Sequence, residues 1–186
     1  MRTIVGMGTA LTDTPAAWRA EQLASDPRWT FRLDDTARRD LVAALNKARD
    51  PAKGLFDYRR QDFELGTAWP VIAAALAEIK RRCGVALIRG LDEKSFELLT
   101  WAIGLHAGVA RPQGKATHYI SAVRDAGTTY RTGTGRGYSS NAELDFHTDS
   151  ADIVFLSCYN YNCIRKCHNM ASICAGVCHS TNGWRG

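Results

Sequence analysis

The stretch ELDFHTDSADIVFLSC, residues 143–158, places His147 and Asp149 two positions apart in an apolar, strand-like run. In a β-strand, side chains at positions i and i+2 point to the same face, so this imidazole and this carboxylate can reach one ion. Leu144 and Phe146 fall on the opposite face, where they can pack into a core. Such a pair supplies two members of the facial triad of two histidines and one carboxylate that holds Fe(II) with open coordination positions. The alternative is a surface pair, or a structural histidine that is satisfied by hydrogen bonds.

Helices come first and strands later in the elements that have to position this pair. Apolar residues at helical spacing behind an acidic first turn predict a helix over 34–50. A second helix is expected over 65–84, with Thr67 as its cap, Pro70 in its first turn and Gly84 after its end. This order predicts an α+β fold. The remaining expected elements are a helix that begins at Asp92 or Ser95 and ends at Gly108, and strands at 85–90, 116–125, 143–149 and 152–159.

The composition predicts a soluble, globular chain with one domain. It has 186 residues, of which 45% are hydrophobic, and a formal net charge of +5. The excess of basic residues favours anionic small molecules, but the charges are scattered, so we expect no nucleic-acid partner. No stretch approaches the roughly 18 apolar residues of a membrane helix, and no cleavable signal is recognisable, so we expect no membrane partner and a cytoplasmic location.

The segment RGYSSNAELDFHTDSADIVFLSC, residues 136–158, resembles the iron-binding stretch of the TauD/TfdA-like Fe(II)- and 2-oxoglutarate-dependent dioxygenases. Upstream, GVALIRGL, GLHAGVARPQ and ISAVRDAG are similar to that family's order of a core strand, a helix that ends near a Pro-Gln pair, and a strand that ends in Arg-Asp. The resemblance covers residues 60–158 well and residues 10–60 more loosely. Its most specific part is the His-Thr-Asp sequence.

The resemblance implies a fold, a reaction and a set of site residues. The fold would be N-terminal helices followed by part of a double-stranded β-helix, a jelly roll of the clavaminate synthase-like kind. The reaction would use Fe(II), 2-oxoglutarate as cosubstrate and O2 to oxidise a C–H bond of a small organic substrate. His147 and Asp149 would be metal ligands. Gln113 and Asn141 match polar positions beside the pocket, although as loop residues they could instead satisfy backbone groups.

The family pattern stops near Cys158. The distal histidine and the arginine that would hold 2-oxoglutarate have no recognisable counterparts among His168, His179, Arg165 and Arg185. We therefore divide the chain into a partial dioxygenase domain, residues 1–158, and a divergent Cys-rich tail, residues 159–186. We expect activity to be impaired by loss of the C-terminal half, and an unpaired sheet edge that favours self-association.

The tail permits a second hypothesis from another functional class. It contains the pattern C-x3-C-H twice, Cys163 to His168 and Cys174 to His179, and thiolates and imidazoles are the ligands that zinc prefers. The chain would then be a non-catalytic binding module whose tail holds zinc. A third interpretation, which we prefer for the tail itself, is that a frameshift or a misjoined reading frame replaces the family pattern after Cys158.

Overall fold

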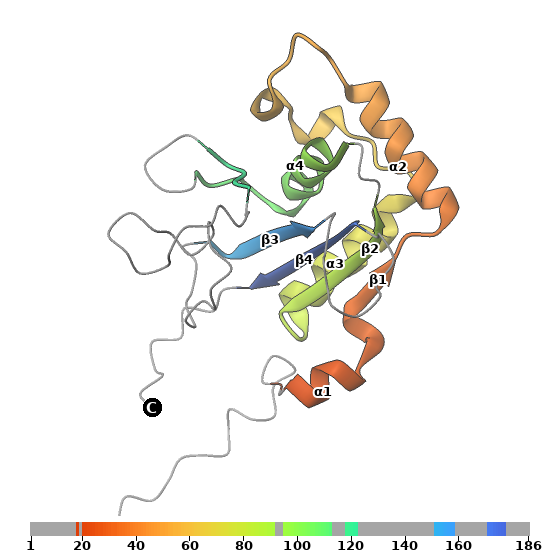
Figure 1. The fold of residues 1–186 in the computed structure, drawn as a ribbon, viewed down its shortest axis with the longest axis vertical. Helices are drawn as coiled ribbons and strands as arrows, with labels where there is room; N and C mark the ends of the chain where they lie inside the picture. Colours follow the sequence, from red (N-terminus) through yellow and green to blue (C-terminus); the bar gives the residue numbers. More distant parts are fainter. Residues whose placement is uncertain are drawn as a thin grey trace, which may run out of the picture.

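The computed structural model describes Trp18 and residues 20–91, 95–112, 118–122, 151–158 and 171–177. These residues form an α+β arrangement, as the sequence predicts: helices cover a small sheet (Figure 1). The elements in chain order are α1 (Ala20–Ser25), η1 (Pro27–Trp29), β1 (Thr30–Arg32), α2 (Asp35–Ala48), η2 (Leu55–Asp57), η3 (Arg60–Asp62), α3 (Ala68–Arg81), β2 (Val85–Leu91), α4 (Phe96–Ala107), β3 (Ile153–Cys158) and β4 (Ala171–Val177), where η marks a 3-10 helix.

The four strands form one mixed sheet in the order β1-β2-β4-β3. β1 pairs with β2 in parallel, with Phe31 opposite Ile88. β4 lies antiparallel between β2 and β3, so that Leu87 and Leu156 flank the same β4 position from opposite sides. A strand from the Cys-rich tail thus completes a sheet whose other members come from residues 30–158.

α2 confirms the helix that was predicted over residues 34–50. Asp34 is its N-cap, and its carboxylate accepts the backbone N–H of Ala37 at 2.8 Å, which satisfies one of the free donors of the first turn. Leu41 and Leu45, one turn apart, are both buried. The apolar spacing therefore fixed both the helix and the face that it buries.

α3 confirms the second predicted helix, but the start of this helix is held differently from the prediction. Thr67 is the N-cap residue, yet its side chain makes no capping bond within the helix. Its hydroxyl instead donates to the carboxylate of Asp40 in α2 at 2.6 Å, and the same oxygen accepts the Thr67 N–H at 3.3 Å. The residue predicted as a local cap is thus a link between two helices. Gly84, at φ +75°, follows the helix as expected.

α4 confirms the third predicted helix and is buried on several sides. Leu98, Leu99, Trp101, Ala102 and Ile103 are all buried, which is typical of a helix that packs between layers rather than on a surface. With 12 residues it is about 18 Å long, well short of the roughly 30 Å hydrocarbon core of a membrane. No helix in the described ranges is long and apolar enough to span a membrane.

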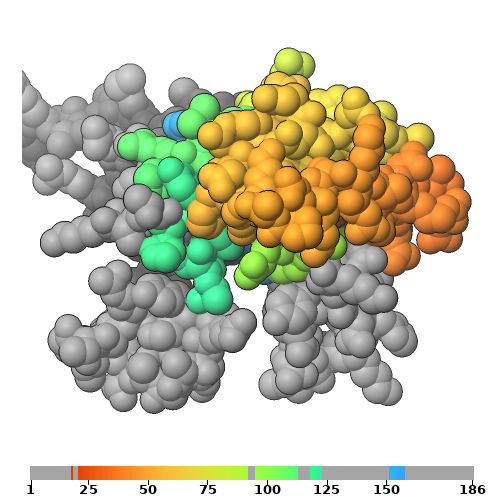
Figure 2. All heavy atoms as spheres, turned by 90° about the horizontal axis from the view of Figure 1, so that it is seen from above, coloured from red at the N-terminus to blue at the C-terminus, as the bar shows by residue number. Residues whose placement is uncertain are grey.

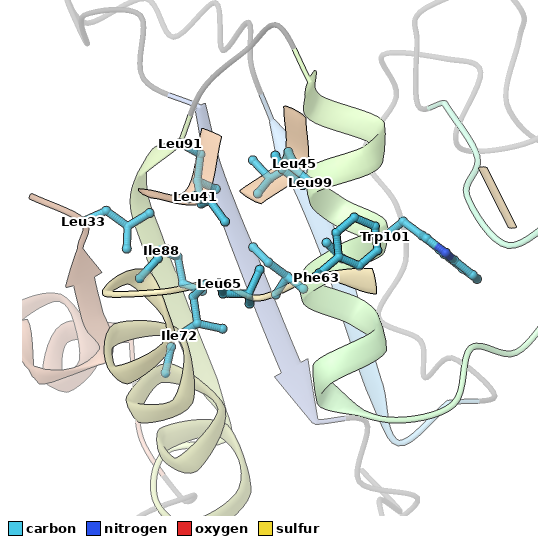
Figure 3. Close-up of a cluster of buried hydrophobic side chains, with 14 of the residues drawn as sticks. Leu33, Leu41, Leu45, Phe63, Leu65, Ile72, Ile88, Leu91, Leu99 and Trp101 are labelled. Atoms are coloured by element: carbon cyan, nitrogen blue, oxygen red, sulfur yellow. The ribbon is translucent and has the colours of Figure 1, made fainter. Parts of the chain in front are cut away.

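One hydrophobic core joins the helices to the sheet. Figure 3 shows Ile72 of α3 close to Ile88 of β2, and Leu41 and Leu45 of α2 belong to the same cluster of side chains. Ile72, with 0% exposure, has no contact with water. Because such residues come from elements before position 108, the core is built largely by the N-terminal part of the chain.

Three features of the described residues differ from the expectations or go beyond them. Residues 118–122, which fall within the strand predicted over 116–125, adopt no regular secondary structure. The short elements α1 and β1, and the tail strand β4, were not predicted. β3 confirms the strand predicted over 152–159, whereas the strand over 143–149 lies outside the described residues, as does part of the tail.

Candidate functional site

The four residues predicted for the iron site, His147, Asp149, Gln113 and Asn141, lie outside the described residues. The structure describes the strand that follows them in the sequence: β3 begins four residues after Asp149. Within the described ranges, no group of three or more His, Cys, Asp or Glu side chains is arranged to hold a metal ion.

β3 presents two unlike faces. Ile153 and Phe155 pack against the hydrophobic core. Ser157 continues this face, with its hydroxyl 2.8 Å from that of Thr100 in α4. Leu156, on the alternate face, is 60% exposed. β3 is thus fixed to the helical layer by one face, while its other face carries an apolar side chain in solvent.

An aromatic cluster holds the described segment that lies upstream of the predicted ligands. The rings of Phe56, Trp101 and Tyr119 approach one another with centroid distances of 5.1 to 5.6 Å and steep interplanar angles. Figure 2 shows residues 118–122, in teal, against the yellow and orange surface of the preceding elements. Trp101 Nε1 is buried and has no hydrogen-bond partner in the described part of the chain. An unpaired buried N–H costs about 1–3 kcal/mol, so a bound molecule or water that accepted from it would stabilise the structure.

A cluster of polar side chains lies at the end of α3. Arg82 donates through Nε to both oxygens of Glu78, at 2.6 and 2.8 Å, and the thiol of Cys83 lies 3.2 Å from the same carboxylate. Burial acts to raise the pKa of Glu78, but the hydrogen bonds from Arg82 and Cys83 outweigh it and hold that pKa below its usual range. Burial raises the pKa of the Cys83 thiol, and Glu78 adds to the effect.

The same cluster reaches the N-terminal elements. Arg82 also lies 3.7 Å from Asp26, whose pKa is held at about 2 by hydrogen bonds from Arg28. Trp18 donates its indole N–H to the carbonyl oxygen of Cys83 at 2.7 Å. Because each carboxylate here has a cation and the thiol stays protonated, the cluster ties the end of α3 to the chain before β1 and offers no free base or nucleophile.

The outer face of α2 forms a shallow depression that is open to solvent. Arg38 lies 3.5 Å from Asp35, and Arg39 donates to the hydroxyl of Thr36. These contacts stay within α2 and do not by themselves indicate a ligand. It is lined by Asp35, Arg38, Arg39, Val42, Ala43 and Asn46.

The contacts around α4 could not be found from the sequence. The spacing of Glu78 and Arg82, four residues apart on one helix, is a recognisable signal for an ion pair. No comparable signal links Thr100 to Ser157, or Trp101 to Tyr119, because these pairs are distant in sequence and their residue types are common. They emerge only when the helix and the strand are packed together.

Comparison with known proteins gives one informative similarity. No family model matches the chain. FR-33289 synthase from Streptomyces rubellomurinus (strain ATCC 31215) is 26% identical over 149 residues, which cover 77% of this chain and 44% of the synthase. The chain thus spans less than half the length of that relative.

Proposed function

We propose that this chain is part of an Fe(II)- and 2-oxoglutarate-dependent oxidoreductase that acts on a small organic substrate. The observation that carries the proposal is the His-Thr-Asp sequence at residues 147–149, which directly precedes the core-anchored strand β3. The similarity to FR-33289 synthase supports an enzyme of the 2-oxoglutarate- and iron-dependent oxygenase superfamily. Membership of the TauD/TfdA-like branch is the finer part of the proposal and rests on the resemblance over residues 60–158.

The proposed fold extends the arrangement that is described. The four-stranded sheet, with α3 and α4 packed against it, would be one wall of a jelly roll, and further strands would form the second wall.

The donor types at the proposed site fit iron. A neutral imidazole from His147 and an ionised carboxylate from Asp149 are both ligands that Fe(II) accepts in the facial triad. When bound, Fe(II) with 2-oxoglutarate and O2 would supply the oxidation of a substrate C–H bond. The chain's own part is to hold these two ligands on one side of the ion and leave the other positions open. The amides of Gln113 and Asn141 would orient the cosubstrate or substrate by hydrogen bonds.

Two ligands bind a metal ion more weakly than three. Within these 186 residues we assign neither the second histidine nor an arginine that would anchor the 2-oxoglutarate carboxylate by paired, charge-assisted hydrogen bonds. We therefore propose that turnover by this chain alone is poor, and that another polypeptide segment supplies the remaining groups.

We propose that the protein associates with a second copy of itself through the edge of β3. Among the described strands, β3 and β1 lie at the two ends of the sheet, and a strand at an edge offers unpaired backbone groups to another chain. Sedimentation velocity over a range of protein concentrations tests this proposal. A single monomeric species at every concentration would contradict it.

Anaerobic titration with Fe(II) in the presence of 2-oxoglutarate tests the proposed function. We expect a visible charge-transfer band in the wild-type protein and its loss in His147→Ala. His118→Ala is a matched control, because this histidine is exposed and is not assigned to the site. The band should be unchanged in that variant.

Two results of this experiment would overturn the proposal. One is the absence of a band in wild-type protein that circular dichroism shows to be folded. The other is stoichiometric zinc that is retained in His147→Ala and lost in Cys163→Ser, which would favour the binding module with a zinc-holding tail.

A further inference from the structure

Two consecutive residues of α4, Thr100 and Trp101, contact the described segments on either side of residues 123–150, the stretch that contains His147 and Asp149. We propose that Thr100 and Trp101 are positioning residues, which hold both flanks of the predicted metal-binding stretch at a fixed separation. The inference rests on the function proposed above, because it assigns these contacts to the iron site. Neither residue is proposed to touch the metal or the substrate.

The downstream flank is held by a directed chain of hydrogen bonds. Thr100 Oγ1 lies 2.8 Å from the carbonyl oxygen of Phe96 and 2.8 Å from Ser157 Oγ. A carbonyl oxygen can only accept, so the single hydroxyl proton of Thr100 is donated to Phe96. Ser157 is then the donor to Thr100 Oγ1. Removal of the Thr100 hydroxyl therefore takes away the acceptor that fixes Ser157, and with it the end of β3.

The upstream flank is held by ring contacts. The ring of Tyr119 lies 5.6 Å from that of Trp101 and 5.1 Å from that of Phe56, in tilted and edge-on arrangements. These geometries are the favourable ones for aromatic pairs. Trp101 is 7% exposed, whereas Tyr119 is only half-buried, so the tryptophan belongs to the core and the tyrosine is the group held against it.

Both contacts are made by one turn of α4, and this turn has little freedom to move. Leu99 is 1% exposed and Ala102 and Ile103 are 0% exposed, so this turn of α4 is packed on its neighbouring positions as well. A chain stretch whose two ends are fixed to one rigid element has fewer conformations to lose when its side chains gather around an ion. The Thr100–Trp101 pair should therefore strengthen metal binding without contacting the metal.

Anaerobic Fe(II) titration with 2-oxoglutarate, applied to four variants, tests the inference. Thr100→Val keeps the shape of the side chain and removes the acceptor, and we expect about tenfold weaker Fe(II) binding, as for supports of metal ligands in other proteins. Tyr119→Leu should weaken binding similarly. Thr100→Ser should restore affinity to within about twofold of wild type. Thr67→Val is the matched control, because it removes a threonine hydrogen bond that links α2 to α3 instead.

Both threonine variants lose a hydrogen bond, but only Thr100→Val removes a contact with β3, so a difference in Fe(II) affinity between them reports on that contact. Equal Fe(II) affinity of Thr100→Val and Thr67→Val would overturn the inference and leave the proposed function standing. Absence of His147-dependent binding in the wild-type protein would overturn both. Hydrogen exchange tests the contacts without iron: Thr100→Val should speed exchange of residues 151–158, and unchanged exchange there would also overturn the inference.

Discussion

The two halves of the sheet differ in how they are covered. We call the half formed by β1 and β2, against which α3 packs, the covered side, and the half formed by β4 and β3 the β3 side. α3 packs against both β1 and β2, and side chains of β2 such as Ile88 are buried. β3 and β4 come from the last 36 residues of the chain and include Leu156, which is 60% exposed. The contrast bears on the predicted chemistry, because His147 and Asp149 precede β3 in the sequence.

The contrast extends to polar groups. On the covered side, Arg82 of α3 is paired with both Glu78 and Asp26. On the β3 side, the described polar contact is a single hydroxyl pair, Thr100 with Ser157.

The same substitution on each side should have very different effects, and this is the largest effect that we predict. Leu91→Ala removes a side chain of β2 that is 4% exposed and should lower the free energy of unfolding by about 2–5 kcal/mol. Leu156→Ala should change it by no more than about 0.5 kcal/mol, because that side chain is already in solvent. Urea unfolding followed by circular dichroism measures both values. A cost for Leu156→Ala as large as that for Leu91→Ala would break the contrast and would indicate that another chain buries Leu156.

Two glycines allow the backbone of β2 to be compared with that of α4. Gly90 in β2 has φ +88°, and a Cβ there would lie 3.0 Å from the carbonyl oxygen of Leu33. Gly90→Ala should therefore cost about 1–2 kcal/mol. Gly104→Ala is the control, because this helical glycine has open space around it and the change should stabilise the protein by about 0.5–1 kcal/mol. Thermal unfolding that shows the same sign for both variants would contradict this assignment of backbone strain to β2.

Local patterns explain which parts of the fold were predictable. The helical spacing of Leu41 and Leu45, and Gly84 after α3, specified α2 and α3 from their own residues. Non-local pairing escaped prediction. β1 has only three residues and exists because it pairs with β2, and β4 was not expected because its sequence, ASICAGV, lies in a tail of unusual composition.

The candidate site was predictable only in its ligand types. The His-Thr-Asp spacing suggests two ligands on one strand face, but spacing cannot say which residues support them. The partner of Ser157 was unpredictable for the same reason that the partner of Thr67 was: a hydroxyl bonds to whatever the tertiary packing brings near. Prediction therefore ended where contacts between distant elements begin.

The smallest predicted effect concerns the stability of the covered side at low pH. The pKa of Glu78 is lowered in the folded protein, so its ionised form contributes stability that is fully present above the ordinary pKa and is lost as pH falls through the lower, folded-state pKa. Glu78→Gln lacks this contribution at every pH. The difference in melting temperature between wild type and Glu78→Gln should therefore be largest near neutral pH and should shrink as the pH falls below about 4.5.

The acid titration also separates the two sides of the sheet, since Glu78 contacts the end of α3 and not β3. Hydrogen exchange in acid should speed up in α3 and β2 of the wild-type protein before it does in β3. Glu97→Gln is the control, because Glu97 is exposed on α4, and its melting temperature should follow that of wild type. A constant gap between wild type and Glu78→Gln from neutral pH to pH 3 would mean that the carboxylate is not preferentially ionised by its partners, and that the charge pairing contributes nothing specific to the covered side.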